Sequence, residues 1–312
     1  CKIIEQLLKK NNKDVKICGN IGKPILSLNQ GKKSFFIIEA SSFQLSYAKF
    51  IKPDYAIILN ISNDHLDWHG SVKNYIDSKL KIFSLQDKNC FAFLSNKILI
   101  RKFKSNSYLS KLFIVKSSTY QKIKKNIKNN YLRSRVNEEN MSFAFSLSKS
   151  LKINNRNFFK SFNAFKGLPH RHEIFYKKKN IKFINDSKAT SFASTKFSLQ
   201  SNNNIFWIVG GLPKLGDKFY LNNLKKKIIK SYIIGKNVNF FGNELKKKIK
   251  YKISNTIKNS LISIFKEIKK YPNKNIVVLL SPASASYDQY ENFMERGNEF
   301  KKLTKLYAKK FF

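Results

Sequence analysis

The sequence predicts an α/β fold with mainly parallel sheets, and three observations support this. Short apolar segments of strand length alternate with longer helical segments along the chain, which is the pattern of β-α-β units. A chain of 312 residues with 42% hydrophobic and 14% aromatic residues can bury real cores, which argues against disorder. Polar residues directly follow several predicted strands, where open α/β sheets bind their ligands.

The expected elements come from these alternating segments, and the apolar runs that predict strands are at residues 35–38, 55–61, 91–94, 112–115, 181–184, 205–210, 231–234 and 276–280. The longer segments between them predict helices at residues 2–10, 72–84, 137–151, 191–199, 220–230, 243–250, 257–270 and 292–309. The length favours two domains. Gly167-Leu168-Pro169 breaks the pattern before a new strand–helix series, so we expect domains at 1–167 and 168–312.

The charge balance is strongly basic, with 61 Lys and Arg against 19 Asp and Glu, a net charge of +42. Such a charge is typical of nucleic-acid or membrane binding. Here it is mostly lysine and is spread along the whole chain, so we expect a solvated lysine-rich surface and no specific nucleic-acid site.

Membrane insertion and secretion are not expected. The apolar runs are far shorter than the roughly 18–20 residues of a membrane helix, and the first residues carry no signal-peptide pattern. The three cysteines, Cys1, Cys18 and Cys90, form no Cys-x-x-Cys pair. We therefore expect a reducing compartment, the cytoplasm, rather than a disulfide scaffold or a zinc ribbon.

The first candidate site combines Glu39, after the strand at 35–38, with His65, after the strand at 55–61. Each alone has an ordinary structural explanation, because an acid favours a helix N-terminus and a histidine can be satisfied in a core. Together, a carboxylate and an imidazole at adjacent strand ends can share a divalent cation. His65 and His69 have the spacing of a zinc helix, but no Glu follows His65, which disfavours zinc.

Further polar segments allow both structural and functional interpretations. Lys79, taken alone, is a solvated helix position. The segment 186–190, Asp-Ser-Lys-Ala-Thr, could cap a helix through Asp186 or Ser187, bind a phosphate through Lys188, or do both. The hydroxyl-rich segment 281–288 could be a plain turn or a carboxylate site at a helix start.

Two common catalytic motifs are missing from the sequence. It contains no Gly-x-Ser-x-Gly motif, which disfavours a serine hydrolase. The phosphate-loop motif Gly-x-x-x-x-Gly-Lys-Ser/Thr is also missing, and the segment 19–24 has the wrong spacing for one.

In their order along the chain, these segments resemble the Mur ligases of peptidoglycan synthesis, and among them the members that add D-glutamate. The stretches that carry the resemblance are Gly19-Asn20-Ile21-Gly22, Glu39-Ala40-Ser41-Ser42-Phe43-Gln44-Leu45, Asp64-His65-Leu66-Asp67, Lys79-Leu80-Lys81-Ile82-Phe83, Asn137 with Asn140, Gly167-Leu168-Pro169-His170-Arg171, Asn185-Asp186-Ser187-Lys188-Ala189-Thr190, Ser281-Pro282 through Asp288-Gln289, Asn292-Phe293 and Arg296-Gly297.

The resemblance implies a central ATPase domain of the phosphate-loop type at 1–167 and a Rossmann-like domain that binds the amino acid at 168–312. It implies an ATP-dependent ligase that converts the alanine carboxylate of UDP-N-acetylmuramoyl-L-alanine to an acyl phosphate, which the D-glutamate amine then attacks. ATP and Mg²⁺ would be its cofactors, and we expect a monomer. In this family the UDP-binding domain and the phosphate loop would precede Cys1, so we expect the chain to be a fragment that is inactive alone.

The resemblance also assigns roles to single residues. Those implied to bind magnesium and act in catalysis are Glu39, His65 and Lys79, the last as a carbamate. The nucleotide-binding residues would be Asn137, Asn140, Arg171, Asp186 and Lys188. The residues implied to contact the acceptor substrate or D-glutamate are Asn20, Thr190, Lys214, Ser286 and Phe293.

Two other interpretations remain open. A paralogous ligase of the folylpolyglutamate type would share the metal-site layout, and substrate competition would distinguish it. A basic polyanion-binding module without catalysis would show a steep salt dependence together with base-sequence preference.

Overall fold

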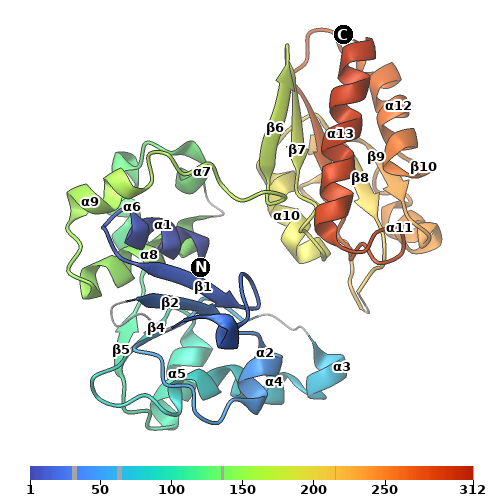
Figure 1. Ribbon diagram of the computed structural model, residues 1–312. Helices are drawn as coiled ribbons and strands as arrows, with labels where there is room; N and C mark the ends of the chain where they lie inside the picture. Colours follow the sequence, from blue (N-terminus) through green and yellow to red (C-terminus); the bar gives the residue numbers. More distant parts are fainter. Residues whose placement is uncertain (30–33, 62–64, 135–136, 215, 312) are drawn as a thin grey trace. The chain divides into compact units, whose positions relative to one another are not determined.

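The computed structural model describes residues 1–311 except 30–33, 62–64, 135–136 and 215. Two compact units divide the chain, Cys1–Lys166 and Gly167–Phe312 (Figure 1). Each unit has its own sheets and its own buried cores. The α/β architecture with mainly parallel sheets is confirmed. The polar residues 62–64, expected after the second strand, lie outside the described residues.

The first unit contains two parallel sheets. A two-stranded sheet pairs β1 (Val15–Gly19) with β2 (Phe35–Glu39), and a three-stranded sheet has the order β3 (Tyr55–Ile58), β4 (Phe91–Leu94), β5 (Lys111–Ile114). The helices of this unit among the described residues are α1 (Lys2–Lys9), α2 (Ser42–Tyr47), α3 (Leu66–His69), α4 (Val72–Leu80), α5 (Lys97–Ser105), α6 (Ser117–Ile123), α7 (Asn130–Arg133), α8 (Glu138–Ser150) and α9 (Asn155–Ser161).

Packing on both faces explains why the central strand β4 of this sheet is apolar throughout. One core joins alternate residues of β3 and β4 to α4 and α5, with Phe83 and Phe103 in edge-to-face contact. The other face packs Phe93 against Phe143 and Leu147 of α8. Strands buried on both sides lose the polar alternation of a half-exposed strand, and Phe91-Ala-Phe-Leu94 follows this rule.

The second unit is built on a six-stranded sheet with the order β10-β9-β8-β11-β7-β6. All neighbours are parallel except β6 and β7, which form an antiparallel pair at one edge. Its strands are β6 (Glu173–Lys178), β7 (Ile181–Asn185), β8 (Ile205–Gly210), β9 (Ile228–Ile234), β10 (Tyr251–Asn255) and β11 (Ile276–Leu280).

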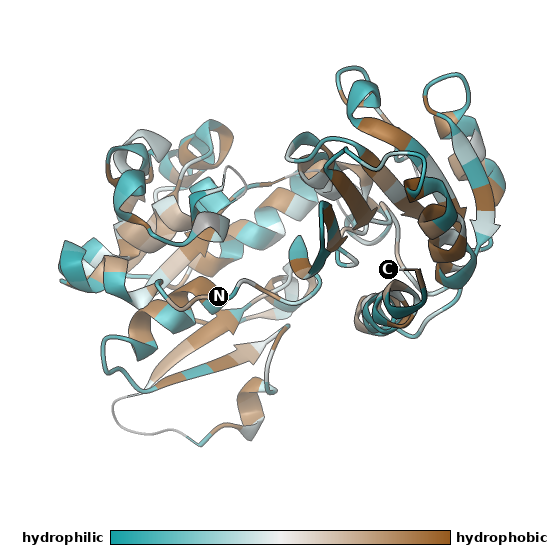
Figure 2. Cartoon of the chain, turned by 90° about the horizontal axis from the view of Figure 1, so that it is seen from above, coloured by the Kyte–Doolittle hydropathy of each residue, from teal (hydrophilic) through white to brown (hydrophobic). Residues whose placement is uncertain are grey.

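Helices cover both faces of this sheet, and Figure 2 shows its strands as a hydrophobic layer. One core packs the sheet against α12 (Ile257–Ile268) and α13 (Phe293–Phe311), and the other packs it against α10 (Phe192–Gln200) and α11 (Val238–Leu245). In α12 the buried residues recur every three or four positions, and the Thr256 side chain accepts a hydrogen bond from Asn259 N. Such periodicity and capping are what a one-sided surface helix requires.

The expected elements agree with the structure except in a few places. The helix expected at 220–230 is wrong, because a short 3-10 turn, Lys225–Lys227, leads into β9. The helix expected at 243–250 lies earlier, as α11. The edge strands β6 and β10, the strand β1 and the helices α2, α5, α6 and α9 were missed. Among the described residues, no helix is both long and apolar enough to cross a bilayer.

Candidate functional site

Asn20 and Glu39 lie together at the carboxyl end of the two-stranded sheet. Gly19 is paired with Glu39 across β1 and β2, and Asn20 N donates a hydrogen bond to Glu39 O at 2.7 Å. Gly19 has φ +94°, and a Cβ atom there would lie 2.5 Å from Glu39 O. Only glycine allows this close approach, so Gly19 is what brings the two predicted residues side by side.

His65 packs against the helix that follows Glu39. Its ring lies 4.8 Å from the ring of Phe43 in α2, in an edge-to-face contact. Helix α2 starts three residues after Glu39 and carries a capping box formed by Ser41 and Gln44. His65 itself has a left-handed conformation, φ 53°, directly before α3.

His69 connects the same helices through hydrogen bonds. Its Nε2 atom is 3.0 Å from Ser42 Oγ, and its Nδ1 atom is 3.4 Å from Ser78 Oγ in α4. Lys79 follows Ser78, and its amine lies 5.2 Å from the centre of the Tyr75 ring, which in turn contacts His69 at 5.3 Å. The chain segments that carry Glu39, His65 and Lys79 therefore meet in one cluster of α2, α3 and α4.

The donor chemistry of this cluster suits a divalent cation only if Lys79 is modified. Among the described residues, no group of three or more His, Cys, Asp and Glu side chains could hold a metal, and Glu39 with His65 supplies two. A carbamate on Lys79 would add the oxygen ligands that magnesium prefers.

The predicted adenine-side residues, Asn137 and Asn140, are adjacent at the start of α8. Asn137 is buried, and its amide donates to Tyr131 O at 3.0 Å. Asn140 Nδ2 lies 3.4 Å from Asn137 Oδ1. Asn137 thus ties the start of α8 to Tyr131 of α7.

Glu139, in the same turn of α8, was missed by the sequence analysis. Its carboxylate accepts a hydrogen bond from Asn60 Nδ2 at 2.7 Å, and Ser95 Oγ lies 3.4 Å from it. Asn60 follows β3 and Ser95 follows β4, so Glu139 ties α8 to the carboxyl ends of two strands. The one feature of the sequence that could have indicated Glu139 is that acidic residues are scarce in this lysine-rich chain.

In the second unit most of the predicted residues lie on the loops that follow β7, β8 and β11, while Arg171 precedes β6 and Phe293 begins α13. From β8 the chain continues to β9 and β10 on one side of β8, and it then returns to form β11 on the other side of β8. The sheet order therefore reverses between β8 and β11, and the crevice at such a reversal is the usual ligand site of an open α/β sheet.

Asp186, at the end of β7, has both carboxylate oxygens engaged inside the unit. Oδ1 accepts from His172 N at 3.0 Å, while Oδ2 accepts from Ser198 Oγ at 2.6 Å and from Ser281 Oγ at 2.8 Å. Burial raises the pKa of Asp186 to about 6 against the lowering effect of these hydrogen bonds. The suggested helix cap at Asp186 or Ser187 is wrong, because Ser191 caps α10.

His172 was not predicted as part of the site. Ser198 donates its one hydroxyl proton to Asp186, so its oxygen accepts from His172 Nδ1–H at 2.8 Å. Burial lowers the pKa of His172 to about 4, so the ring is neutral near pH 7. Asp186, Ser198 and His172 form one hydrogen-bonded chain.

Arg296 is another buried residue to which the sequence assigned no role. It is 1% exposed, and it donates to Ser187 Oγ at 3.0 Å, Ser187 O at 2.9 Å, Ser284 O at 2.9 Å and Ala285 O at 3.2 Å. Burial lowers its pKa to about 10, so it stays charged near neutral pH. One guanidinium therefore holds the loop after β7 to the loop after β11.

Lys188 and Phe293 lie together beside the loops that the Arg296 guanidinium connects. The Lys188 amine is 5.0 Å from the centre of the Phe293 ring, and Ser187 Oγ donates to Phe293 O at 2.8 Å. Lys188 N donates to His170 O at 3.1 Å. Arg171 follows in the same turn, exposed, with its N–H on Leu168 O at 3.3 Å.

The loops that carry Thr190, Lys214 and Ser286 are also connected. Leu212 exchanges two backbone hydrogen bonds with Ala285, at 2.9 and 3.0 Å, next to the buried Ser286. Phe192, the first residue of α10, lies two residues after Thr190, and its N–H donates to Asp217 Oδ2 at 2.8 Å. This hydrogen bond ties the loop after Lys214 to α10. No helix starts within 281–288, because α13 begins at Phe293. Ser286 lies on a loop.

The comparisons with known proteins cover both units. Residues 1–164 match the family model of the Mur ligase middle domain. The UDP-N-acetylmuramoylalanine–D-glutamate ligase of Pseudothermotoga lettingae is 33% identical over 318 residues, covering 98% of this chain and 72% of that protein. The enzyme of the same name from Rickettsia felis is 30% identical over 325 residues, with coverage of 98% and 72%.

Solved structures agree on the fold. The MurF ligase of Thermotoga maritima, solved with ADP, has a TM-score of 0.69 at 19% identity and covers 97% of this chain and 77% of its own. A bifunctional folylpolyglutamate synthase/dihydrofolate synthase of Yersinia pestis, solved with AMPPNP and manganese, has a TM-score of 0.60 at 11% identity, with coverage of 97% and 85%.

Proposed function

Because the chain belongs to the Mur ligase family, we propose that it joins D-glutamate to UDP-N-acetylmuramoyl-L-alanine in an ATP-dependent step of peptidoglycan synthesis. The observation that carries the proposal is the match to D-glutamate ligases over 98% of the chain, through both units. Residues 1–167 would bind ATP and residues 168–312 the amino acid. The enzyme would act as a monomer in the cytoplasm, where ATP and nucleotide-linked substrates are made.

The proposed reaction has two steps. The alanine carboxylate attacks the terminal phosphorus of ATP, which forms an acyl phosphate and releases ADP. The amine of D-glutamate then attacks the acyl carbon, so that phosphate leaves and the amine loses a proton. Negative charge builds up in both transition states, and stabilising that charge is the main task of such a site.

For the first unit we propose that Glu39 and His65, with Lys79 as a carbamate, hold magnesium. The ion would neutralise charge on the transferred phosphoryl group. Asn20 would contact the acceptor carboxylate, since it lies beside Glu39 at the same sheet edge. The role of the α2–α4 cluster would be to fix the three ligand-bearing segments against one another.

For the nucleotide we propose contacts from Asn137 and Asn140 to adenine, and from Arg171 and Lys188 to ribose and phosphates. Asp186 was expected among these contacts. Its buried carboxylate already accepts three hydrogen bonds, which favours a role in positioning the Arg171 turn through the neighbouring His172 N–H.

For D-glutamate we propose a pocket formed by Thr190, Lys214, Ser286 and Phe293. Lys214 would pair with a carboxylate of the substrate, while Thr190 and Ser286 would donate hydroxyl hydrogen bonds, and such charge-assisted bonds are the strong ones. Support comes from the connected loops, since Arg296 and the Leu212–Ala285 pairing hold them together.

The test of the proposed function is an assay of the protein as its own gene encodes it. Release of phosphate and ADP should require both UDP-N-acetylmuramoyl-L-alanine and D-glutamate. L-glutamate and folate substrates should give only background, which separates this enzyme from a folylpolyglutamate-type ligase. Turnover with L-glutamate but not with D-glutamate would refute the substrate assignment.

Lys79 offers a sharper test of the metal site. Lys79→Ala should lower kcat by about 10²–10³-fold, the usual loss of one stabilising group, and short carboxylates such as acetate should restore part of it. Lys73→Ala, at an exposed position of the same helix, serves as the control and should keep full activity. Full activity of Lys79→Ala would remove this residue from the site.

A further inference from the structure

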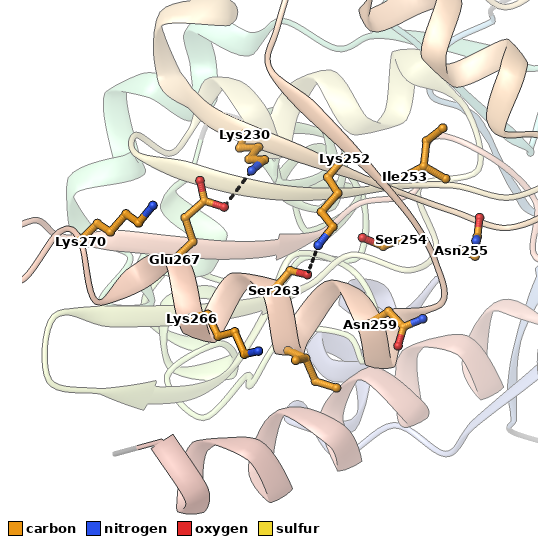
Figure 3. Close-up of a pocket in the computed structure, with 11 residues that line it drawn as sticks. Lys230, Lys252, Ile253, Ser254, Asn255, Asn259, Ser263, Lys266, Glu267 and Lys270 are labelled. Carbon is orange, nitrogen blue, oxygen red and sulfur yellow. Dashed lines mark hydrogen bonds and ion pairs between the residues drawn. The ribbon is translucent and has the colours of Figure 1, made fainter.

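A groove of about 530 Å³ lies between the β9–β10 edge of the second unit's sheet and helix α12 (Figure 3). Its lining contains none of the site residues considered above. The lining residues are Lys230, Lys252, Ile253, Ser254, Asn255, Asn259, Ile262, Ser263, Lys266, Glu267 and Lys270. A volume of this size falls within the range of small-molecule sites, roughly 300–1,000 Å³.

The groove is strongly cationic. Four lysines line it, while Glu267 is the one carboxylate among its described lining residues. Glu267 is already engaged, because it pairs with Lys230 at 2.9 Å and accepts from Tyr232 OH at 2.7 Å. Lys270 also lies close enough to Glu267 to lower the pKa of that carboxyl. The charges of Lys252 and Lys266 have no paired carboxylate within the lining, which favours an anionic ligand.

A buried hydroxyl gives an independent indication. Ser254 is 5% exposed, and its Oγ atom has no hydrogen-bond partner among the described residues. A buried polar atom without a partner costs free energy that a bound ligand or water can recover. Figure 3 shows Ser254 next to the point where Lys252 meets Ser263 at 3.0 Å.

The remaining lining is polar and largely neutral. Asn255 and Asn259 lie towards one end of the groove, and the Lys230–Glu267 pair lies towards the other. Two isoleucines supply the apolar side chains, and no aromatic residue lines the groove. Amide and hydroxyl groups of this kind suit the hydroxyls of a sugar better than a flat apolar ring.

We propose that this groove binds a phosphorylated sugar. Lys252 and Lys266 hold the phosphate, with Ser254 donating its hydroxyl hydrogen bond to it. Asn255 and Asn259 meet the sugar hydroxyls. The site is separate from the proposed ligase chemistry, so its occupancy would link the protein to a second, phosphate-bearing metabolite.

The first experiment measures binding of glucose 6-phosphate to the full chain at 150 mM salt, with glucose and inorganic phosphate as separate probes. Hydrogen exchange of residues 251–270 should slow with glucose 6-phosphate, less with phosphate and not with glucose. Equal slowing by phosphate and glucose 6-phosphate would overturn the sugar part of the proposal. No slowing in this segment would overturn the site.

The second experiment compares two buried serines, one of which lines the groove and one of which does not. Ser254→Ala should weaken glucose 6-phosphate binding by about fivefold, the value of one hydrogen bond. Ser231→Ala is the matched control, because Ser231 is also buried with an unpartnered Oγ but does not line the groove. Equal effects of both variants would refute a contact at Ser254.

The third experiment separates a site from general positive charge. The double variant Lys252→Ala/Lys266→Ala should weaken binding by about 20-fold or more. The control Lys225→Ala/Lys226→Ala removes the same charge from exposed positions outside the groove and should change affinity less than about twofold. Similar losses in both would show that the ligand responds only to net charge, and would overturn the proposal.

Discussion

Asp186 and His172 should cancel each other's effect on the pH dependence of folding. Asp186 has a folded pKa of about 6 against 3.8 for the free group. Its contribution to stability is therefore present below pH 4 and lost as pH rises through 6. His172 has a folded pKa of about 4 against 6.5, so its contribution is present above pH 6.5 and lost as pH falls through 4.

The two contributions are of similar size and opposite sign. Each pKa differs by a little over 2 between the folded and unfolded states, which at about 1.4 kcal/mol per pH unit is about 3 kcal/mol. Between pH 4 and 6.5 the loss from Asp186 therefore offsets the gain from His172. Removing either group alone should expose the effect of the other.

The variants keep the shape of each side chain. In His172→Asn the amide can still donate to Ser198, and the free energy of unfolding should fall by about 3 kcal/mol relative to the parent from pH 4 to 6.5. In Asp186→Asn it should rise by a similar amount over the same range. The double variant should again match the slope of the parent.

The assay is urea unfolding followed by tryptophan fluorescence. The chain has two tryptophans, so a Trp68→Phe background leaves Trp207, which is fully buried in the second unit and donates to Ser281 O at 2.8 Å. Trp207 therefore reports on the unit that contains Asp186. Parallel pH profiles for the parent and both single variants would refute the reasoning.

The remaining predictions concern the loops of the second unit. Arg296→Ala should lower the free energy of unfolding by about 2–5 kcal/mol, because it leaves the carbonyls of Ser187 and Ser284 without their partner at about 1–3 kcal/mol each, whereas Lys305→Ala at an exposed position of the same helix should change it by less than about 0.5 kcal/mol; urea titration measures both. Gly211→Ala should cost about 2 kcal/mol or more and raise the KM for D-glutamate, since its Cβ would lie 2.3 Å from Ala285 O. Gly242→Ala, in α11 with ordinary contacts at 3.5 Å, is its control and should be neutral or stabilising, so equal losses would argue against steric exclusion.

The sequence predicted the buried strands well and the edges poorly. Strands Phe91–Leu94, Ile205–Gly210 and Ile276–Leu280 match in both bounds, because continuous apolar runs leave little choice. The edge strand β6 ends in two lysines, and four of the five residues of β10 are exposed. Neither strand therefore stands out in the sequence as a continuous apolar run. The segment 220–230 resembles a helix by composition, but pairing with β8 draws Ile228–Ile234 into the sheet, which local propensity cannot show.

The candidate site was predicted where a motif marked it and missed where only three-dimensional contacts do. Glu39 ends β2 and His65 comes after β3, but these strands lie in different sheets, so the expectation of adjacent strand ends is wrong and it is the contact of His65 with Phe43 that brings the two segments together. Arg296 stands in the first turn of the long helix α13, and nothing in the neighbouring sequence indicates that it is 1% exposed. His172 gains its role only because Ser198, 26 residues later, turns towards it.

Helix α13 runs for 19 residues from Phe293 to Phe311, a length of about 28 Å. Its first turns hold the loops through Arg296, while at its far end Phe311 stacks on Phe265 with ring centres 5.3 Å apart. The ring of Phe311 covers the buried ring of Phe265, so removal of the last turn of α13 would expose part of this core and loosen the packing of the helix on the sheet.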